Sequence, residues 1–589
     1  MTHDTLLSRW KENKSLPTHR PALLGTRHMA VAGHYLAAHA AFRVLEAGGN
    51  AVDAGCAAGI ALGVLQPDIV NVAGVAPIVV YLADRDEVVS ISGLGTWPKA
   101  ASAAFFREKH GGKIPTGILR TVVPAAPDAW ITALTRFGTM SFADVAADAI
   151  RFARDGFPAH PLMADLIAQH AAEYARDPAA AAIYLPNGRA PAVGDLFVQA
   201  DLGRTLQHMA DQDRAAAAHG GREAGLKAAH DAFYKGDIAA TITRFYRENG
   251  GWLTAEDMAS FSVEIEKPVR TSFAGIDVYG CGPWCQGPSL LQAMNLLSAD
   301  ELRAMGHNSV DYVHVVTEAL KLAFADREGH FGDPRFVDVP LEGLLSAEYA
   351  KLRRTLIRRD TAWPELPPAG DPRGMHAAGA APVLPKAAMA QPAGLKDTSY
   401  ACAVDRWGNV FSATPSDSSF DGVVVPGTGL APSSRGSQSW TGADHPSRVE
   451  GGKRPRLTPN PALAIKRGDF AMPFGSPGGD VQIQAMLQVF LNVVLFGMDP
   501  QEAVEAPRFA TFSFPDSFEP HAYYPGRLNI EASLAEKVGP ALAARGHKVE
   551  QWPDGIWRAG AVCTIVADQQ RKLLAAGADP RRQSYAAGW

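Results

Sequence analysis

Cysteine is scarce in this chain: 589 residues contain five, at positions 56, 281, 285, 402 and 563. An odd and scattered set in so long a chain excludes the disulfide framework of small secreted domains. The first twenty residues lack the apolar stretch and the small-residue cleavage site of a secretory signal. No apolar run reaches the roughly 20 residues that cross a bilayer. We therefore expect a cytoplasmic protein with no membrane partner.

Neither positive nor negative charge dominates the chain. The chain has 56 Lys and Arg against 61 Asp and Glu, a formal net charge of -5. Such a balance provides no overall positive field, so we expect no nucleic-acid partner. Cys281 and Cys285 lie four apart, but no second pair of ligands follows at metal-binding spacing. We find no nucleotide, flavin or metal motif and predict neither a cofactor nor a metal.

The remaining composition is that of a globular chain, with 47% hydrophobic and 20% charged residues. Hydrophobic periodicity predicts helices over 35–47, ending at two glycines, and over 51–65. A strand pair is predicted over 78–82 and 87–91. The stretch 140–318 reads as mostly helical, with a helix starting at Thr254, where Asp257 completes a capping box.

Residues 361–397 differ in character from the rest of the chain. Seven prolines lie between positions 364 and 392, with many Ala and Gly and few large apolar residues. Such a segment buries little surface, so we predict a mobile linker. Strands and a helix are predicted after it, at 400–404, 410–413, 423–425, 462–465, 470–474, 561–566 and 480–496. We predict an α/β fold with four layers, αββα, assembled from both parts.

The linker ends at Thr398, at the edge of a predicted strand. If the bond before Thr398 were cut, its α-amine, with a pKa of about 7.7–8.0, would act as the base for its own hydroxyl. Threonine is common at strand starts, so local features alone favour a structural role.

A glycine-rich turn, GSPGGD over 475–480, lies between a predicted strand and a helix. The N–H groups of Gly478 and Gly479, beside a helix start, suit an oxyanion hole. A plain turn is the alternative. The turn lacks the Lys-Ser/Thr ending of a phosphate-binding loop.

Several motifs in order resemble the γ-glutamyltransferase family over nearly the whole chain. They are VLEAGGNAVD at 44–53, FYKGD at 233–237, GGWLTAED at 250–257, EALKLAFADREGHFGDP at 318–334, TSYACAVDRWGN at 398–409, KRP at 453–455, GSPGG at 475–479 and EAPR at 505–508.

The resemblance implies a sandwich of the N-terminal-nucleophile class and a precursor that cuts itself before Thr398. The products would be a large subunit, 1–397, and a small catalytic subunit, 398–589, and a dimer of such protomers is an assembly it allows. Thr398 would be the nucleophile, and Ser416 matches a threonine that hydrogen-bonds the nucleophile's amine. Gly478 and Gly479 match the oxyanion hole. An acyl-enzyme would pass its acyl group to water or to an amine.

The glutamate-binding positions depart from the family. Leu94 stands where the family has an arginine for the substrate carboxylate, and Gln438 where it has an acid for the substrate amine. Leu457 and Thr458 replace a pair of serines, and Ser418 replaces an asparagine. Each lost charge-assisted bond costs roughly 1.5–3 kcal/mol. The acyl group is therefore predicted not to be glutamyl.

Two arginines lie close to these positions, Arg435 and Arg456. We hypothesise that one of them binds a carboxylate placed differently in the substrate; a surface arginine is the alternative for each.

The predicted function is a self-processing N-terminal-threonine amide hydrolase. Its substrate would be a small amide with an oxamate-like or glutaryl-like acyl group. One alternative is a true γ-glutamyl hydrolase or transferase acting on glutathione and γ-glutamyl amides. Another is an unprocessed, inactive binding protein.

Overall fold

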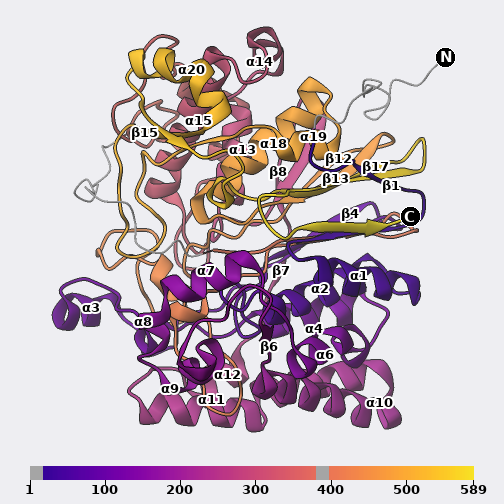
Figure 1. Ribbon diagram of the computed structural model, residues 1–589. Coiled ribbons are helices and arrows are strands. Elements are labelled where there is room, and N and C mark those ends of the chain that lie inside the picture. The colour runs from indigo at the N-terminus through magenta and orange to yellow at the C-terminus, as the bar shows by residue number, and fades with distance from the viewer. Residues whose placement is uncertain (1–17, 380–396) are drawn as a thin grey trace.

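The computed structural model describes residues 18–379 and 397–589. Two seven-stranded sheets lie face to face in it (Figure 1). In spatial order, the first contains β1 (Leu23–Gly25), β18 (Leu573–Ala578), β17 (Cys563–Asp568), β13 (Phe470–Gly475), β12 (Ala462–Lys466), β9 (Ile276–Gly280) and β8 (Val269–Phe273). The second contains β19 (Tyr585–Gly588), β2 (Met29–Ala32), β10 (Ala401–Val404), β11 (Val410–Ala413), β3 (Ile78–Leu82), β4 (Glu87–Ile91) and β7 (Ile265–Glu266).

Helices cover the outer face of each sheet, and each helical layer has its own apolar core. Over the second sheet lie α1 (Tyr35–Glu46), α2 (Ala51–Leu65), α4 (Ala126–Phe137), α6 (Ala147–Asp155) and α10 (Ala200–Tyr234). Over the first lie α13 (Gly287–Asn295), α15 (Val310–His330), α18 (Gln482–Phe496) and α20 (Ala532–Ala544). A third core fills the space between the sheets. The predicted αββα fold is therefore confirmed.

Smaller elements complete the structure. The helices are α3 (Ala103–His110), α5 (Phe142–Val145), α7 (Pro161–Gln169), α8 (Ala171–Tyr174), α9 (Pro178–Tyr184), α11 (Asp237–Glu248), α12 (Ala255–Ser260), α14 (Ala299–Met305), α16 (Leu341–Leu344), α17 (Ala347–Arg354) and α19 (Pro500–Glu505). The strands are β14 (Phe509–Thr511), β15 (Arg527–Glu531), β16 (Lys548–Trp552), β5 (Phe157–Pro158) and β6 (Leu196–Phe197).

The central pair β10 and β11 is buried on both faces. Ala401 and Ala403 face the helical core, whereas Cys402 and Val404 face the core between the sheets, as the two-residue period of a strand requires. Small alanines on the helical face let α2, whose residues are all buried, lie against the sheet.

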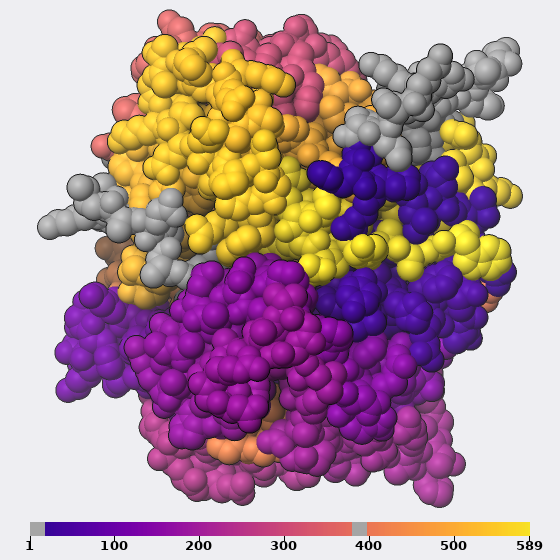
Figure 2. Space-filling view, viewed as in Figure 1, coloured from indigo at the N-terminus to yellow at the C-terminus, as the bar shows by residue number. Residues whose placement is uncertain are grey.

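The two ends of the described chain meet in these sheets. β2 pairs with β19, and β1 pairs with β18, so in each sheet a strand from the start of the described chain lies beside one from its end. Figure 2 shows the indigo start of the described chain against the yellow residues near its end. Each sheet therefore combines strands from before and after Thr398.

Most of the predicted elements are confirmed, including the capping box of Thr254 with Asp257 at the start of α12. One prediction is wrong. Residues 423–425 form a single bridge, Val425 with Leu430, because the chain turns back at once through Gly427 and Gly429 at positive φ. The stretch 140–318 is mostly helical, as predicted, and it also contains β7, β8 and β9, which extend the edges of the sheets.

The predicted linker is also corrected in part. Residues 361–379 pack against the protein: the Leu366 N–H donates to the Tyr523 hydroxyl at 2.8 Å, and the Gly370 N–H to the Asp326 carboxylate at 2.8 Å. Proline-rich backbone is anchored here by side chains of other elements. Residues 380–396 lie outside the described residues.

Among the described residues, one helical stretch, 479–496, is apolar and long enough to cross a membrane by composition, but 89% of it is buried inside the protein. Its apolar residues form part of the core under the first sheet.

Two helical glycines provide a matched stability test. A Cβ on Gly55 of α2 would lie 1.9 Å from the buried ring of Phe411, whereas one on Gly539 of α20 would lie 3.6 Å from Val549. We expect Gly55→Ala to destabilise by about 1–3 kcal/mol through overpacking. Gly539→Ala should be neutral or stabilising by up to about 1 kcal/mol through helix propensity. Thermal melting of both variants measures the two effects. Equal shifts in melting temperature would contradict the close packing of Gly55 against Phe411.

Candidate active site

Strand register brings the predicted nucleophile to its predicted partner. β10 and β11 are antiparallel, with Ala401 opposite Ala413. Continuing this register by three residues places Thr398 opposite Ser416, where the two form an isolated bridge. Both side chains are buried, Thr398 at 1% exposure.

Hydrogen bonds link the Thr398 hydroxyl to the peptide bond that precedes it. The Ser416 hydroxyl donates to the Asp397 carbonyl oxygen at 2.8 Å. A hydroxyl has one proton to donate, and that of Ser416 is used in this hydrogen bond. Thr398 is therefore the donor in the 2.7 Å hydrogen bond between the Thr398 and Ser416 hydroxyls. Gln482, in the first turn of α18, donates to the Thr398 oxygen at 3.3 Å. A proton path therefore runs from the Thr398 hydroxyl through Ser416 to the Asp397 carbonyl.

Arg435 lies at the same carbonyl. Its guanidinium donates to the Ser416 hydroxyl and, at 3.3 Å, to the Asp397 carbonyl oxygen. Burial lowers the pKa of Arg435, and Asp417, at 3.7 Å, acts against that shift. Asp417 has a φ of 140° and accepts hydrogen bonds from Ser433 and Ser434. The sequence analysis missed both Asp417 and Gln482. The available signals were that Asp417 directly follows Ser416 and that Gln482 lies just after the glycine-rich turn.

The predicted substrate residues extend from Arg435. Arg435 donates to the Gln438 side-chain oxygen at 3.4 Å, and Gln438 donates to the Thr458 hydroxyl at 3.0 Å. Ser418 is buried, and its hydroxyl has no hydrogen-bond partner among the described residues. The structure thus brings Arg435, Gln438 and Thr458 together beside Ser416.

Arg456 lies in a different environment. It pairs with Glu328 at 2.7 Å and stacks over Trp440 with its guanidinium carbon 4.3 Å from the ring centroid. Arg435 also has an acid nearby, Asp417, but its guanidinium contacts Ser416 and the Asp397 carbonyl, so it is the better placed of the two hypothesised carboxylate ligands.

Gly478 and Gly479 link β13 to the turn that opens α18. Their φ angles are 118° and 56°, in the left-handed region that favours glycine. Burial raises the pKa of the Asp397 carboxyl, and the nearby Gly478 N–H acts against that rise, which places the turn on the acyl side of the peptide bond before Thr398. The turn therefore lies at the predicted reaction centre, as an oxyanion hole requires.

Leu94 and Leu457 are both 1% exposed, and both belong to the apolar core between the sheets, with Trp284. Neither position offers a cation or a hydroxyl to a substrate.

Comparisons with known proteins agree with this geometry. A family model described as gamma-glutamyltranspeptidase matches residues 37–589. The chain belongs to the γ-glutamyltranspeptidase family. It is 34% identical over 547 residues to the acylase ACY 1 proenzyme of Pseudomonas sp. (strain SE83), covering 90% of this chain and 88% of that one.

Two further relatives cover nearly the whole chain. The glutathione hydrolase-like YwrD proenzyme of Bacillus subtilis is 29% identical, over 96% of this chain and 99% of that one. The crystal structure of a cephalosporin acylase from Bacillus halodurans superposes with a TM-score of 0.81 and 29% identity, over 98% of this chain and 99% of that one. The chain is thus an acyl-transfer enzyme of the γ-glutamyltranspeptidase family, and the alternative of an inactive binding protein is set aside.

One group of side chains outside this site could hold a metal. Ligand atoms of His314, Glu318 and His547 lie within 4.8 Å of one another. The two imidazoles already share a 2.8 Å hydrogen bond, and Lys321 lies 2.8 Å from the Glu318 carboxylate. The ammonium occupies the position where a cation would bind, so we assign no metal to this cluster.

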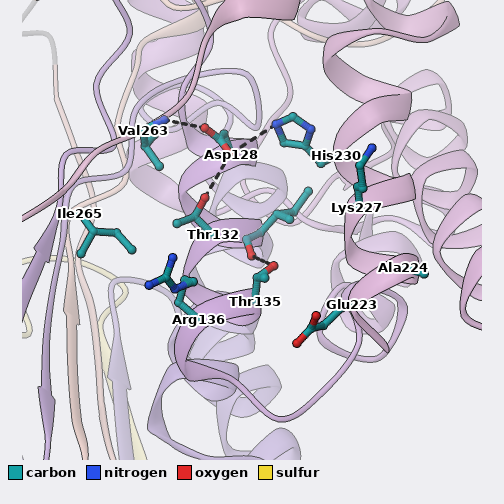
Figure 3. A pocket seen from close by; sticks show the side chains of 11 residues that line it. Asp128, Thr132, Thr135, Arg136, Glu223, Ala224, Lys227, His230, Val263 and Ile265 are labelled. Carbon is teal, nitrogen blue, oxygen red and sulfur yellow. Dashed lines mark hydrogen bonds and ion pairs between the residues drawn. The ribbon is translucent and has the colours of Figure 1, made fainter. Parts of the chain in front are cut away.

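A groove of about 700 Å³ lies on the surface over α4 and α10 (Figure 3). Asp128 at its wall accepts from the Val263 N–H at 2.6 Å and lies 3.4 Å from His230. None of the predicted site residues lines this groove.

Ser416→Ala tests the proton path. The variant removes the hydroxyl that links the nucleophile to the carbonyl, and positioned proton transfer contributes about 10²–10⁴-fold. We expect self-cleavage to slow by at least about 100-fold. Intact mass against time after synthesis measures it. Ser412→Ala is the control, because Ser412 is a buried serine of β11 that bonds Tyr400 and Ala462 instead. Cleavage at the wild-type rate in Ser416→Ala would exclude the path.

Asp68, which lies close to Asp397, offers a pH test. It is fully buried, and neither carboxyl oxygen has a hydrogen-bond partner among the described residues. Burial raises its pKa from 3.8 to about 7. Between these values the folded chain holds a proton that the unfolded chain releases, so stability falls as the pH rises.

Asp68→Asn should therefore raise the melting temperature more at pH 8 than at pH 5. Both measurements use the Thr398→Ala background, so that processing does not vary. Asp84→Asn, at a side chain 74% exposed, is the control. An equal effect of Asp68→Asn at both pH values would contradict the raised pKa.

Proposed function

We propose that this enzyme cuts its own chain before Thr398 and then hydrolyses small amides whose acyl group carries a carboxylate without an adjacent amine. The observation that carries the proposal is the hydrogen-bonded path from the Thr398 hydroxyl through Ser416 to the Asp397 carbonyl, with Arg435 at that carbonyl.

Self-cleavage follows this path. The Thr398 oxygen attacks the Asp397 carbonyl carbon while its proton moves to Ser416, and Ser416 and Arg435 stabilise the negative charge on the carbonyl oxygen. The C–N bond then breaks as the amide nitrogen takes up the proton that the Thr398 hydroxyl gave to Ser416, which leaves an ester between Asp397 and Thr398. Water hydrolyses the ester, and Thr398 becomes a new N-terminus with a free α-amine.

Amide hydrolysis repeats the same chemistry with a separate substrate. The α-amine takes the proton of the Thr398 hydroxyl, and the oxygen attacks the substrate carbonyl. The oxyanion is stabilised at Gly478 and Gly479. The amine product leaves with the proton, and water then cleaves the acyl-enzyme to release the acid.

The acyl preference rests on charge. Leu94 cannot bind a carboxylate ionically, and Gln438 cannot pair with a substrate ammonium as an acid does. Arg435 remains as a buried cation one hydroxyl away from the nucleophile. An oxamate-like or glutaryl-like acyl group supplies the carboxylate that Arg435 would pair with, and lacks the ammonium that has no acidic partner.

A γ-glutamyl substrate is the second candidate, favoured by the likeness to a glutathione hydrolase-like protein. We also propose that processed protomers form a dimer and that the enzyme is cytoplasmic. Five buried cysteines without disulfides are consistent with a cytoplasmic location.

Two chromogenic amides separate the candidates, because glutaryl-p-nitroanilide differs from γ-glutamyl-p-nitroanilide only by lacking the α-amine. We expect the processed enzyme to prefer the glutaryl compound by about tenfold or more in kcat/KM, since each unpaired charged group costs about 1.5–3 kcal/mol. Turnover is normalised to the cleaved fraction found by mass spectrometry. A preference for the γ-glutamyl compound would favour the second candidate.

Arg435→Gln should raise KM for the glutaryl amide by roughly 10–100-fold, through loss of one charge-assisted bond. Arg448→Gln is the control, because Arg448 is a partly exposed arginine of the same chain segment, paired with Glu450. Initial rates per cleaved enzyme measure both. An unchanged KM in Arg435→Gln would remove Arg435 from the substrate site.

A further inference from the structure

The side chain of Asp397 fills a buried anion site beside the nucleophile. It is 1% exposed, and its carboxylate accepts the Thr398 N–H at 2.8 Å. Arg582 forms an ion pair with the same carboxylate, and the nearby Gly478 N–H acts against the rise in the Asp397 pKa that burial causes. One cation and two backbone N–H groups thus surround one carboxylate at the bond that is to be cut.

The cut separates this carboxylate from its donors. Thr398, Gly478 and Arg582 all follow the scissile bond and stay with the small chain, whereas Asp397 becomes the last residue of the large chain. The Thr398 N–H becomes a free α-amine that is no longer covalently linked to Asp397. Self-cleavage therefore frees Asp397 to leave, and the donors remain as a set.

Among the described residues, Arg582 forms an ion pair with no acid other than Asp397. Its remaining contacts are neutral: the Thr398 carbonyl at 3.4 Å, the Trp557 carbonyl at 3.2 Å and the Trp557 ring centroid at 5.3 Å. Its Nε has no hydrogen-bond partner among the described residues. Asp68 is the nearby acid; in the uncut chain burial, together with the charge of Asp397, raises its pKa to about 7, so it is partly protonated at neutral pH. A buried guanidinium without an anion is costly, so the vacated site favours binding one.

We propose that Arg582, the Gly478 N–H and the Thr398 amine form a carboxylate-binding site in the processed enzyme, which Asp397 occupies before the cut. The ligand is the carboxylate of the acid released by hydrolysis, because the site adjoins the Thr398 hydroxyl and includes the Gly478 N–H, one of the two predicted oxyanion donors. This inference rests on the proposed function for the cut and for the identity of the acid. Small monocarboxylates should then inhibit the enzyme.

Three unprocessed variants test the site without any catalysis. Thr398→Ala keeps Asp397 in place, and Asp397→Ala with Thr398→Ala vacates the site. A triple variant that adds Arg582→Gln removes the charge. Acetate is the probe, since it matches the deleted Asp397 side chain in size and charge, and chloride at equal ionic strength is the reference.

We expect acetate to raise the melting temperature of the vacated variant saturably, by about 2 °C or more, since a ligand that binds only the folded state stabilises it. The filled variant and the triple variant should show no such rise. An equal response of all three, or none from the vacated variant, would overturn the proposal. Because these proteins lack the nucleophile, the result is independent of whether the enzyme hydrolyses amides.

The processed enzyme provides a second measurement should the vacated variant not fold. Acetate should inhibit glutaryl-p-nitroanilide hydrolysis competitively, and Arg582→Lys, which keeps the charge but loses the planar fork, should raise the inhibition constant about tenfold. Arg448→Gln is again the control. Absence of competitive inhibition in the cleaved wild-type enzyme would overturn the site, while self-cleavage and turnover would be unaffected.

Discussion

The antiparallel pairing of β10 with β11 is the constraint on which the site depends. It holds Thr398 opposite Ser416 and brings both to one end of the buried strand pair. Every further contact of the nucleophile builds on that placement: Ser416 reaches the Asp397 carbonyl, and Arg435 reaches Ser416. A slip of one residue would turn the Thr398 side chain to the other face of the sheet.

The core explains why this pair is so well fixed. β10 and β11 lie between β2 and β3 in the middle of their sheet, with α2 packed on one face and the first sheet on the other. Alanines on the helical face and a glycine at position 55 allow close approach of α2. The nucleophile is therefore attached to one of the most constrained parts of the chain, while Arg435 and Gln438 lie on a short turn, η5 (Arg435–Gln438).

Much of this arrangement could be predicted from the sequence. Periodicity located the helices before and after Thr398 and most strands, because buried strands and amphipathic helices have distinct apolar patterns. Strands β7 to β9 were missed, since their partners lie far away along the chain and only the assembled sheet holds them. The anchored part of the linker, 361–379, was missed for the same reason: its partners, Tyr523 and Asp326, are remote in sequence.

In the site too, residues within local motifs could be predicted, whereas residues placed by remote contacts could not. Thr398 and the glycines follow from local motifs, whereas Arg582 lies 184 residues beyond Thr398 and nothing near it in the sequence marks it. Arg435 and Arg456 looked equivalent in the sequence. Only tertiary contacts distinguish them, because Arg456 is neutralised by Glu328 and Arg435 lies at the scissile carbonyl.

Two buried arginines contact Asp397 in the uncut chain. Arg435 binds its carbonyl oxygen and Arg582 its side-chain carboxylate, so the uncut chain satisfies buried positive charge with its own residue. Both arginines stay with Thr398 after the cut. Arg435 keeps Asp417 at 3.7 Å after the cut, whereas Arg582 loses its carboxylate partner if Asp397 leaves. An unpaired buried charge is far less stable than a paired one, so the vacated Arg582 site favours an anion. The two arginines therefore have different proposed roles: Arg582 binds the carboxylate that hydrolysis forms, and Arg435 is the cation that would select an acidic acyl group.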